Sequence, residues 1–329
     1  MLRRLLVILP ILWCSAAFGV EVTDSTGRTM QVPAEISHVL PAGPPAAILL
    51  EAIAPDLMVG WPGPLSAEAK TLLPDSANHP RIPRLTGHED VTDKIKALQP
   101  DLILDYGEVT PRYFGLAQTT QQKTGVPTLL FAGALDKIPL VVRQVGAILH
   151  REARAETLAT YFEAMLALPV LPLPTSLGAH PRVLYARGAD GLTVTAPDTD
   201  VTEVFKHLGW IVLAPDGSGT FRTSTIAAIA ALDPDIVIFS DPAMREAVTD
   251  PDAWKAVRAV RDGHALVAPA LPFGWVEEPP SINRLLGLAW LSGHEPVTLA
   301  ATFNAVVYGR ALTPTQLDSV LVGVHSLKL

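Results

Sequence analysis

Short, continuous runs of aliphatic residues alternate with longer stretches of mixed polarity along most of this chain. In the first half the runs are HVLPAG, LMVGW, LILDYG and PTLLFAG, and stretches of helical character lie near 44–54, 111–124 and 137–149. A run that is apolar at every position is typical of a strand buried on both faces, as in a parallel sheet. The pattern therefore predicts a series of βα units.

The second half of the chain repeats this order. Its runs RVLYARG, WIVLAP, DIVIFSD and HALVAPA alternate with predicted helices near 200–208, 225–232 and 252–259. Two stretches correspond in detail: IKALQPDLIL at 95–104 and IAALDPDIVI at 229–238 lie 134 residues apart and share Ile, Ala, Leu, Pro and Asp in place. Each predicts a helix end, a turn at the proline and a buried strand. We therefore expect two similar α/β lobes.

The segment between the two halves predicts a connection of a different kind. Residues 151–168 indicate one long amphipathic helix with Leu158, Phe162 and Met165 on a common face, and a proline-rich segment follows as far as Pro181. We therefore predict an α/β fold of two lobes joined by a single long rigid helix. Its parts are an N-terminal lobe (20–150), a connecting helix with a Pro-rich linker (151–180) and a C-terminal lobe (181–329).

The first residues predict a cleaved signal peptide over 1–19. Arg3 and Arg4 precede an apolar stretch that is too short to span a bilayer, and small residues follow it. Cys14, the only cysteine, would leave with the signal, so the mature chain would have no disulfide, thiolate metal site or cysteine nucleophile. Export without a lipid anchor indicates the periplasm.

Composition narrows the classes of partner. Hydrophobic residues make up 49% and charged residues 18% of the chain, which is typical of a globular protein and not of a disordered one. Loss of Arg3 and Arg4 leaves 23 basic against 33 acidic residues, a net charge near −10. This charge argues against binding to nucleic acid or to anionic lipid.

The common enzyme signatures do not occur. We find no G-x-S-x-G elbow, no G-x-G-x-x-G after a strand, no Walker A loop and no H-E-x-x-H. The cluster GHEDVTD at 87–93 offers His88, Glu89, Asp90 and Asp93 as metal ligands. We favour the alternative, a solvated loop whose Asp or Thr caps the next helix, because metal ligands normally converge from several elements.

Candidate ligand-binding residues follow the strands of both halves. α/β folds bind ligands at the carboxyl ends of their strands. Aromatic faces there would supply contact area, and guanidinium groups would pair with anionic groups of a large ligand. The candidates at or near these ends are Trp61, Tyr106, Arg112, Tyr113, Arg187, Arg222, Asp241, Phe273 and Trp275.

The stretch PFGWVEEPPSINRLLGLAWLSG at 272–293 has two parts. SINRLLGLAWLSG predicts a core helix with Ser281 as N-cap and Gly293 just after its end. PFGWVEE precedes it at the end of a strand, and Phe273 and Trp275 are the strongest candidates for ligand contact in the second lobe. The adjacent Glu277 and Glu278 point in different directions and make a poor acid/base pair.

The chain resembles the periplasmic substrate-binding proteins of ABC importers for iron–siderophore complexes, haem and cobalamin, and within them the iron-compound binding subgroup. The resemblance covers essentially the whole mature chain. It depends on the order and spacing of VTDSTGRTMQVPAEISHVL, DKIKALQPDLIL, VLYARGADGLTV, AALDPDIVIFSDP, AWKAVRAVRDGHALVAP and PFGWVEEPPSINRLLGLAWL. It implies two Rossmann-like lobes joined by one rigid helix, with the ligand held between them.

The resemblance also implies docking to an inner-membrane permease with its ATPase, through one acidic residue on each lobe. In the first lobe the matching position is Asp93, with Glu89 close by. In the second lobe it falls near Ala227, where there is no acid. This departure puts symmetrical docking in doubt, or moves the second contact to another acid. We expect a monomer.

Three functions are open at this point. The first is a non-enzymatic binding protein that captures a metal chelate, such as an iron–siderophore, haem or a corrinoid, and needs no cofactor. The alternative is direct binding of a free or weakly chelated divalent metal such as nickel or zinc, for which His88, Glu89 and Asp90 are the only hint. The third is a periplasmic hydrolase, which would need a nucleophile–base pair or paired carboxylates. The sequence does not name the chelate.

Overall fold

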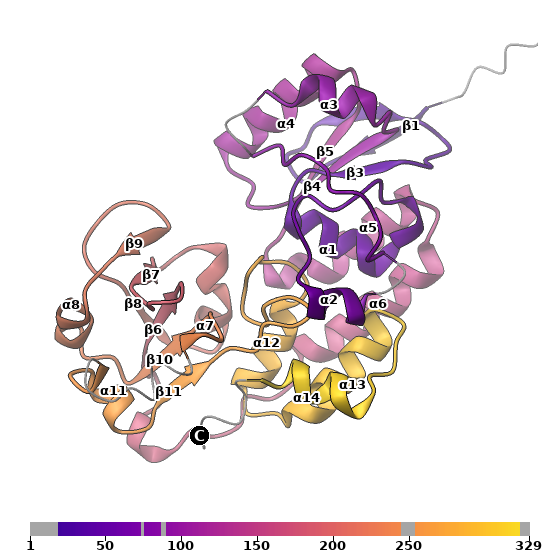
Figure 1. Ribbon diagram of the computed structural model, residues 1–329. Helices are drawn as coiled ribbons and strands as arrows, with labels where there is room; N and C mark the ends of the chain where they lie inside the picture. The colour runs from indigo at the N-terminus through magenta and orange to yellow at the C-terminus, as the bar shows by residue number, and fades with distance from the viewer. Residues whose placement is uncertain (1–18, 74–75, 87–89, 245–253, 323–329) are drawn as a thin grey trace, which may run out of the picture.

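The computed structural model describes residues 19–73, 76–86, 90–244 and 254–322. The predicted signal peptide, His88 and Glu89 lie outside the described residues, apart from Gly19. Figure 1 shows two α/β lobes, each with its own sheet, and a group of helices beside both. The predicted α/β fold with two sheet-containing lobes is thus confirmed.

The first lobe contains an antiparallel hairpin and a parallel three-stranded sheet. The hairpin pairs β1 (Val20–Thr23) with β2 (Thr29–Val32), and the sheet has the order β3-β4-β5. Its further elements are β3 (Val39–Pro41), α1 (Pro44–Ile53), a 3-10 turn (Pro55–Leu57), α2 (Ala67–Leu72), α3 (Thr92–Ala97), β4 (Leu102–Gly107), α4 (Pro111–Thr124), β5 (Thr128–Ala132), a 3-10 turn (Leu135–Lys137) and α5 (Ile138–Ile148).

The second lobe has a mixed sheet of order β11-β10-β6-β7-β9, in which β8 also pairs with β6. The four strands β8, β6, β10 and β11 run parallel, whereas β7 and β9 are antiparallel additions. Its elements are β6 (Arg182–Arg187), β7 (Thr193–Thr195), a 3-10 turn (Asp200–Thr202), α7 (Glu203–His207), β8 (Ile211–Leu213), β9 (Phe221–Thr223), α8 (Ile226–Ala231), β10 (Ile236–Phe239), α11 (Arg258–Arg261) and β11 (Ala265–Val267).

The sheets are covered on both faces, as the continuous aliphatic runs predict. Along β6, Val183 and Tyr185 belong to the largest hydrophobic core, whereas Leu184 and Ala186 belong to a second core on the opposite face. All four side chains are at most 1% exposed. Because successive strand residues point to opposite faces, a strand with helices on both sides needs apolar residues at every position.

Helices link the two lobes. The helix α6 (Glu152–Leu166) follows α5, and α12 (Arg284–Leu291), α13 (Pro296–Val307) and α14 (Pro314–Val320) end the described chain. Figure 1 shows these four together, next to α1. Phe162 and Phe303 join α6 and α13 in one core, with ring centroids 6.4 Å apart. Arg154 donates hydrogen bonds to the carbonyls of Ala52 and Val306, at 2.9 and 2.8 Å, and so joins the ends of α1 and α13.

The internal repeat adopts the same turn in both lobes. Gln99 and Asp233, the residues before the two prolines, have positive φ values of 48° and 45°. Asp101 then accepts hydrogen bonds from the backbone N–H groups of Ser37 and His38, at 2.7 and 2.8 Å. Asp235 likewise accepts one from Arg182 at 2.8 Å. The Pro-Asp pair therefore ends each helix and fixes the start of the neighbouring parallel strand.

The helix in 281–293 begins later than the sequence indicates. Its first turn starts at Arg284, and Ser281 is not the N-cap, because its hydroxyl donates to the carbonyl of Pro45 at 2.8 Å and so contacts the first lobe. Gly293 follows the C-cap with a φ of 90°, which confirms the predicted end. Among the described residues, none of the helices is both long and apolar enough to cross a bilayer.

Candidate functional site

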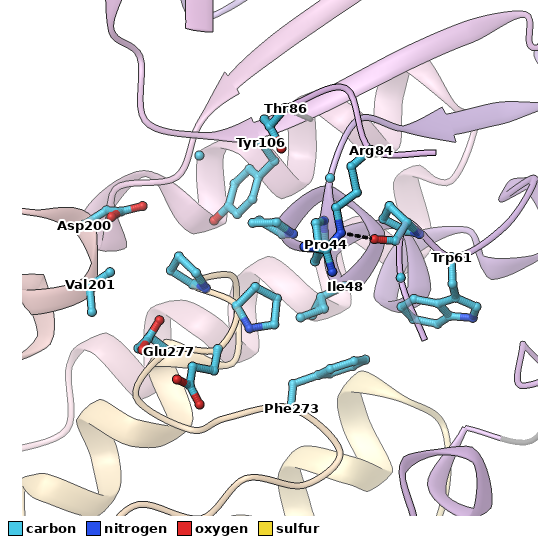
Figure 2. A pocket seen from close by; sticks show the side chains of 18 of the residues that line it. Pro44, Ile48, Trp61, Arg84, Thr86, Tyr106, Asp200, Val201, Phe273 and Glu277 are labelled. Carbon is cyan, nitrogen blue, oxygen red and sulfur yellow. Dashed lines mark hydrogen bonds between the residues drawn. The ribbon is translucent and has the colours of Figure 1, made fainter. Parts of the chain in front are cut away.

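A cleft of about 670 Å³ lies between the lobes. The first lobe's wall comes from the residues that follow β3 and β4 and from the segment 61–69. The second lobe's wall comes from the ends of β6 and β9, the 3-10 turn at Asp200 and the loop 270–280. Figure 2 shows Tyr106 and Arg84 on one side of this space and Asp200, Glu277 and Phe273 on the other. The cleft thus opens at the carboxyl ends of strands, where α/β folds bind ligands.

Aromatic rings of both lobes meet at one end of the cleft. The rings of Trp61 and Phe273 lie 5.8 Å apart, and the indole N–H of Trp61 donates to the carbonyl of Ser76 at 2.9 Å. Tyr106, which is 2% exposed, lies deeper in the first lobe's wall. Phe221 of β9 lies on the opposite wall and remains 46% exposed. These rings provide apolar faces for a ligand of considerable area.

The loop that carries Phe273 is held by glycines. A Cβ on Gly274 would lie 1.8 Å from the carbonyl oxygen of Glu277, and one on Gly287 of α12 would lie 2.3 Å from that of Trp275. The loop therefore packs backbone against backbone on its helix, which only glycine allows at these two places. As a result Phe273 faces the cleft, while Trp275 is fully buried and its ring contacts Trp290 at 6.2 Å.

An arginine and two glutamates form the charged centre of the second lobe's wall. The Arg187 guanidinium lies 2.6 Å from a carboxylate oxygen of Glu277 and 2.8 Å from one of Glu278. It also stacks over the ring of Phe221, 4.1 Å from the centroid. Ser240 donates to Glu278 at 3.0 Å. Burial raises the pKa of Glu277 to about 8, although the nearby Arg187 acts in the opposite direction.

Three further carboxyl groups face the cleft. Asp105 is 8% exposed, accepts a hydrogen bond from the backbone N–H of Tyr106 at 2.9 Å, and has its pKa raised by burial to about 6. Glu108 of the first lobe lies close to Asp200 of the second. Burial is the main cause that raises the pKa of Glu108, and the nearby Asp200 carboxylate raises it further. Like charges therefore face each other across the cleft.

Arg284 ties the two lobes together beneath the cleft. Its side chain is 1% exposed and donates to the carbonyls of Gly133, in the first lobe, and Asp200, in the second. It also pairs with Glu203 at 3.1 Å, and Glu203 accepts the backbone N–H of Leu135 at 3.0 Å. A buried guanidinium with this many partners fixes how the lobes meet.

The structure brings five of the nine predicted ligand-binding residues to the cleft: Trp61, Tyr106, Tyr113, Arg187 and Phe273. The other four do not line it. Arg112 is exposed and lies over the ring of Tyr113, Arg222 donates to the carbonyl of Pro215 at 2.6 Å, and Asp241 accepts the N–H of Ala243 at 2.9 Å. Trp275, the fourth, is buried as described above.

Other lining residues carry no sequence signal that singles them out, namely Arg84, Asp105, Glu108, Asp200 and Phe221. Asp105 precedes Tyr106, and Glu108 follows it by two positions. The end of β4 therefore brings two carboxyl groups to the cleft, although the sequence pattern indicates only its aromatic residue. The expectation that Glu277 and Glu278 point in different directions is wrong, because both carboxyl groups reach the Arg187 guanidinium and both residues line the cleft.

The predicted docking residues are only partly described. Asp93 is exposed in the first turn of α3, and Ala227 at the matching place in α8 is exposed as well. Asp90 accepts hydrogen bonds from Thr92 and pairs with Lys123 at 2.8 Å, but the expected Asp or Thr cap is wrong, because Val91 is the N-cap of α3 and no side chain caps this helix. Within the described ranges, no three His, Cys, Asp or Glu side chains converge on a potential metal site.

Comparison with known proteins gives a consistent result. A family model described as "Periplasmic binding protein" matches residues 64–271, which is more than half of the chain. None of the curated proteins matches the chain in sequence. Among solved structures, an ABC transporter solute binding protein from Sulfurospirillum deleyianum is similar with a TM-score of 0.81 at 20% identity, covering 91% of this chain and 98% of that one.

Two further structures have the same fold at lower similarity. The molybdate periplasmic binding protein of a Haemophilus influenzae ABC transporter gives a TM-score of 0.69 at 14% identity, with 90% of this chain and 99% of that one covered. A protein of an ABC-type Fe3+-hydroxamate transport system from Saccharomonospora viridis gives 0.58 at 18% identity, with 84% and 98% covered. At these identities the similarity shows a shared fold.

Proposed function

The chain belongs to the periplasmic binding protein family, and on that premise we propose that it captures a metal chelate in the cleft between its lobes. Members of this family bind a solute in the periplasm for an ABC importer and are not enzymes. The proposed cargo is an iron–siderophore, haem or a corrinoid, which the protein would deliver to an inner-membrane permease and its ATPase.

The observation that supports this proposal is the size and lining of the cleft. A volume of about 670 Å³ falls in the range of sites that enclose a whole organic ligand. A bare metal ion or a small oxyanion would leave most of it empty. Trp61, Tyr106 and Phe273 supply broad apolar faces from both lobes, which suits the organic shell of a chelate.

Direct metal binding has less support. Structural and catalytic metal sites need three or four side-chain ligands that converge. The described residues contain no such group, and Asp90, one of the three candidate ligands, is engaged with Thr92 and Lys123. We therefore keep the chelate as the proposed cargo and propose Asp93 as the first lobe's docking residue for the permease.

Tryptophan fluorescence tests the proposal. Purified protein is titrated with a ferric hydroxamate siderophore, haem and a corrinoid, and at least one is expected to quench the emission in a saturable manner. The variant Trp61→Phe should lose most of this quenching, because Trp61 lines the cleft. The matched control Trp210→Phe should keep it, since Trp210 stacks on Phe205 inside the second lobe. If none of the three chelates binds, the proposal is wrong.

A further inference from the structure

The charge of the cleft is negative. Its lining contains five carboxyl groups, from Asp105, Glu108, Asp200, Glu277 and Glu278, but only two guanidinium groups, from Arg84 and Arg187. Protonation of Glu277 and Glu108, whose pKa values are raised, still leaves three carboxylates against two cations. At neutral pH, above the pKa of about 6 of Asp105, the surplus therefore holds even when Glu277 and Glu108 are protonated, although the sequence indicates a cleft with arginines ready for anions.

Arg187 is not available as an anion-binding group. Both of its neighbours at the wall are carboxylates, Glu277 at 2.6 Å and Glu278 at 2.8 Å, and one face of its guanidinium covers Phe221. An anionic ligand would have to compete with two glutamates for this charge. If it displaced them, it would leave the Glu278 carboxylate without its counter-charge beside the nearly buried Glu277, which is costly in a low-dielectric environment.

Prolines make the cleft poor in backbone N–H donors. Seven prolines line it: Pro44, Pro45, Pro62, Pro64, Pro272, Pro279 and Pro280. Proline has no backbone N–H, so these positions offer carbonyl acceptors but no donors. Pro44 and Pro45 form the first turn of α1, where free N–H groups would otherwise attract an anion.

Two of the remaining donors already have protein partners. The indole N–H of Trp61 donates to Ser76, and Nε of Arg84 donates to the carbonyl of Pro62. The other charged group nearby, Arg284, lies buried next to Tyr106 and is paired with Glu203. The rings of Phe221, Tyr113 and Phe273 line the cleft, and the faces of aromatic rings attract cations.

From the carboxylate surplus, the compensated Arg187 and the scarcity of backbone N–H donors, we infer that the cleft selects a positively charged, donor-rich ligand. Within the proposed function, on which this inference depends, that ligand is a metal chelate with a protonated amine or a net positive charge. A strongly anionic chelate, such as a ferric tris-catecholate, belongs to the disfavoured class.

A matched pair of probes isolates the charge. Ferric desferrioxamine B ends in a protonated amine, and its N-acetyl derivative has the same iron-binding groups without that charge. Titration calorimetry at neutral pH should give an affinity for the amine form at least about tenfold higher, because one carboxylate near a cation contributes this much at modest effective dielectric. The preference should shrink in high salt.

A variant pair locates the effect. Asp105→Asn keeps the size of the side chain and an oxygen for the Tyr106 N–H but removes a carboxylate of the cleft. It should lower affinity for the amine form and leave the acetylated form nearly unchanged. The control Asp262→Asn, at an exposed residue beside Arg261, should change neither.

The outcomes separate the inference from the proposed function. Equal affinity for the two hydroxamates, or tighter binding of a ferric tris-catecholate, overturns the inference and leaves chelate capture intact. Absence of binding to all three siderophores overturns the inference, and failure of haem and a corrinoid as well overturns the proposed function. A preference for the amine form that Asp105→Asn reduces supports both.

Discussion

Arg187 at the end of β6 and Glu277 in the loop after β11 form an ion pair of 2.6 Å in the wall of the cleft. Glu277 is 2% exposed, and its pKa rises to about 8 even beside the guanidinium, because desolvation outweighs the attraction. The two segments lie far apart in the sequence. The pair therefore joins the strand that leads into the cleft to the loop that presents Phe273.

Removal of Arg187 should destabilise the protein. The variant Arg187→Met leaves the Glu278 carboxylate without its counter-charge beside the buried Glu277, and we expect a loss of about 2 kcal/mol in the free energy of unfolding, less than for a fully buried pair because Arg187 is partly exposed. Urea denaturation measures it. The control Arg143→Met removes ion pairs with the exposed Glu156 and Glu163 and should change the free energy of unfolding much less. Equal losses in the two variants would show that burial of the Arg187 pair is immaterial.

Glu277 should make stability depend on pH. Its pKa is about 8 in the folded protein and near 4.5 in the unfolded chain. Between these values the folded state holds a proton that the unfolded state has lost. The contribution of protonated Glu277 to the free energy of unfolding is therefore complete below about pH 4.5 and is lost as pH rises to about 8. Glu277→Gln should remove this part of the pH dependence, about 4–5 kcal/mol over the whole interval.

Chemical denaturation of wild type and Glu277→Gln at several pH values between 5 and 8 measures this effect. The difference between the two proteins isolates Glu277 from Asp105, whose pKa of about 6 also contributes below neutral pH. Parallel stability curves for the two proteins would mean that Glu277 does not hold its proton in the folded state.

The two aspartates of the repeat should be equivalent. Asp101→Ala leaves the N–H groups of Ser37 and His38 without their acceptor, and Asp235→Ala does the same to Arg182. Each loss is expected to cost about 1–3 kcal/mol. The control Asp136→Ala, which removes an exposed pair with Lys137, should be close to neutral. A neutral result at Asp101 or Asp235 would contradict the strand-fixing role, and urea denaturation provides the measurement.

Docking to the permease should depend on Asp93 without affecting cargo binding. Asp93 is exposed on α3, away from the cleft lining. Asp93→Lys should leave the chelate affinity unchanged and reduce uptake by the reconstituted importer, because it reverses the charge at the contact. Asp198→Lys, at another exposed acid, serves as the control. Normal uptake with Asp93→Lys would exclude this residue from docking.

The elements that the sequence predicts well have local signals. The helix predicted at 111–124 matches α4 because Thr110 caps it, Pro111 starts it and Gly125 ends it in the left-handed conformation. In contrast, β7 and β9 have three residues each. The first is polar at both ends, and the second has an arginine in the middle. Only their pairing with β6 and with each other makes them strands, and no local pattern predicts such pairing.

The residues of the cleft also divide into those with a local sequence signal and those placed only by tertiary structure. Trp61, Tyr106 and Phe273 could be predicted because they are aromatic and follow strands. Phe273 and Trp275 have the same local signal, yet the close backbone packing at Gly274 and Gly287 exposes the first to the cleft and buries the second. The pairing of Arg187 with Glu277 depends on tertiary structure and reverses the expected charge preference of the site.

Native mass spectrometry of the protein isolated from its own periplasm tests directly whether the protein captures a metal chelate. We expect a complex whose extra mass is that of a metal chelate, released together with its metal on unfolding. Loss of the extra mass in the double variant Trp61→Ala/Phe273→Ala would assign the ligand to the cleft. A protein that carries only a bare metal ion, or a ligand without metal, would contradict the claim.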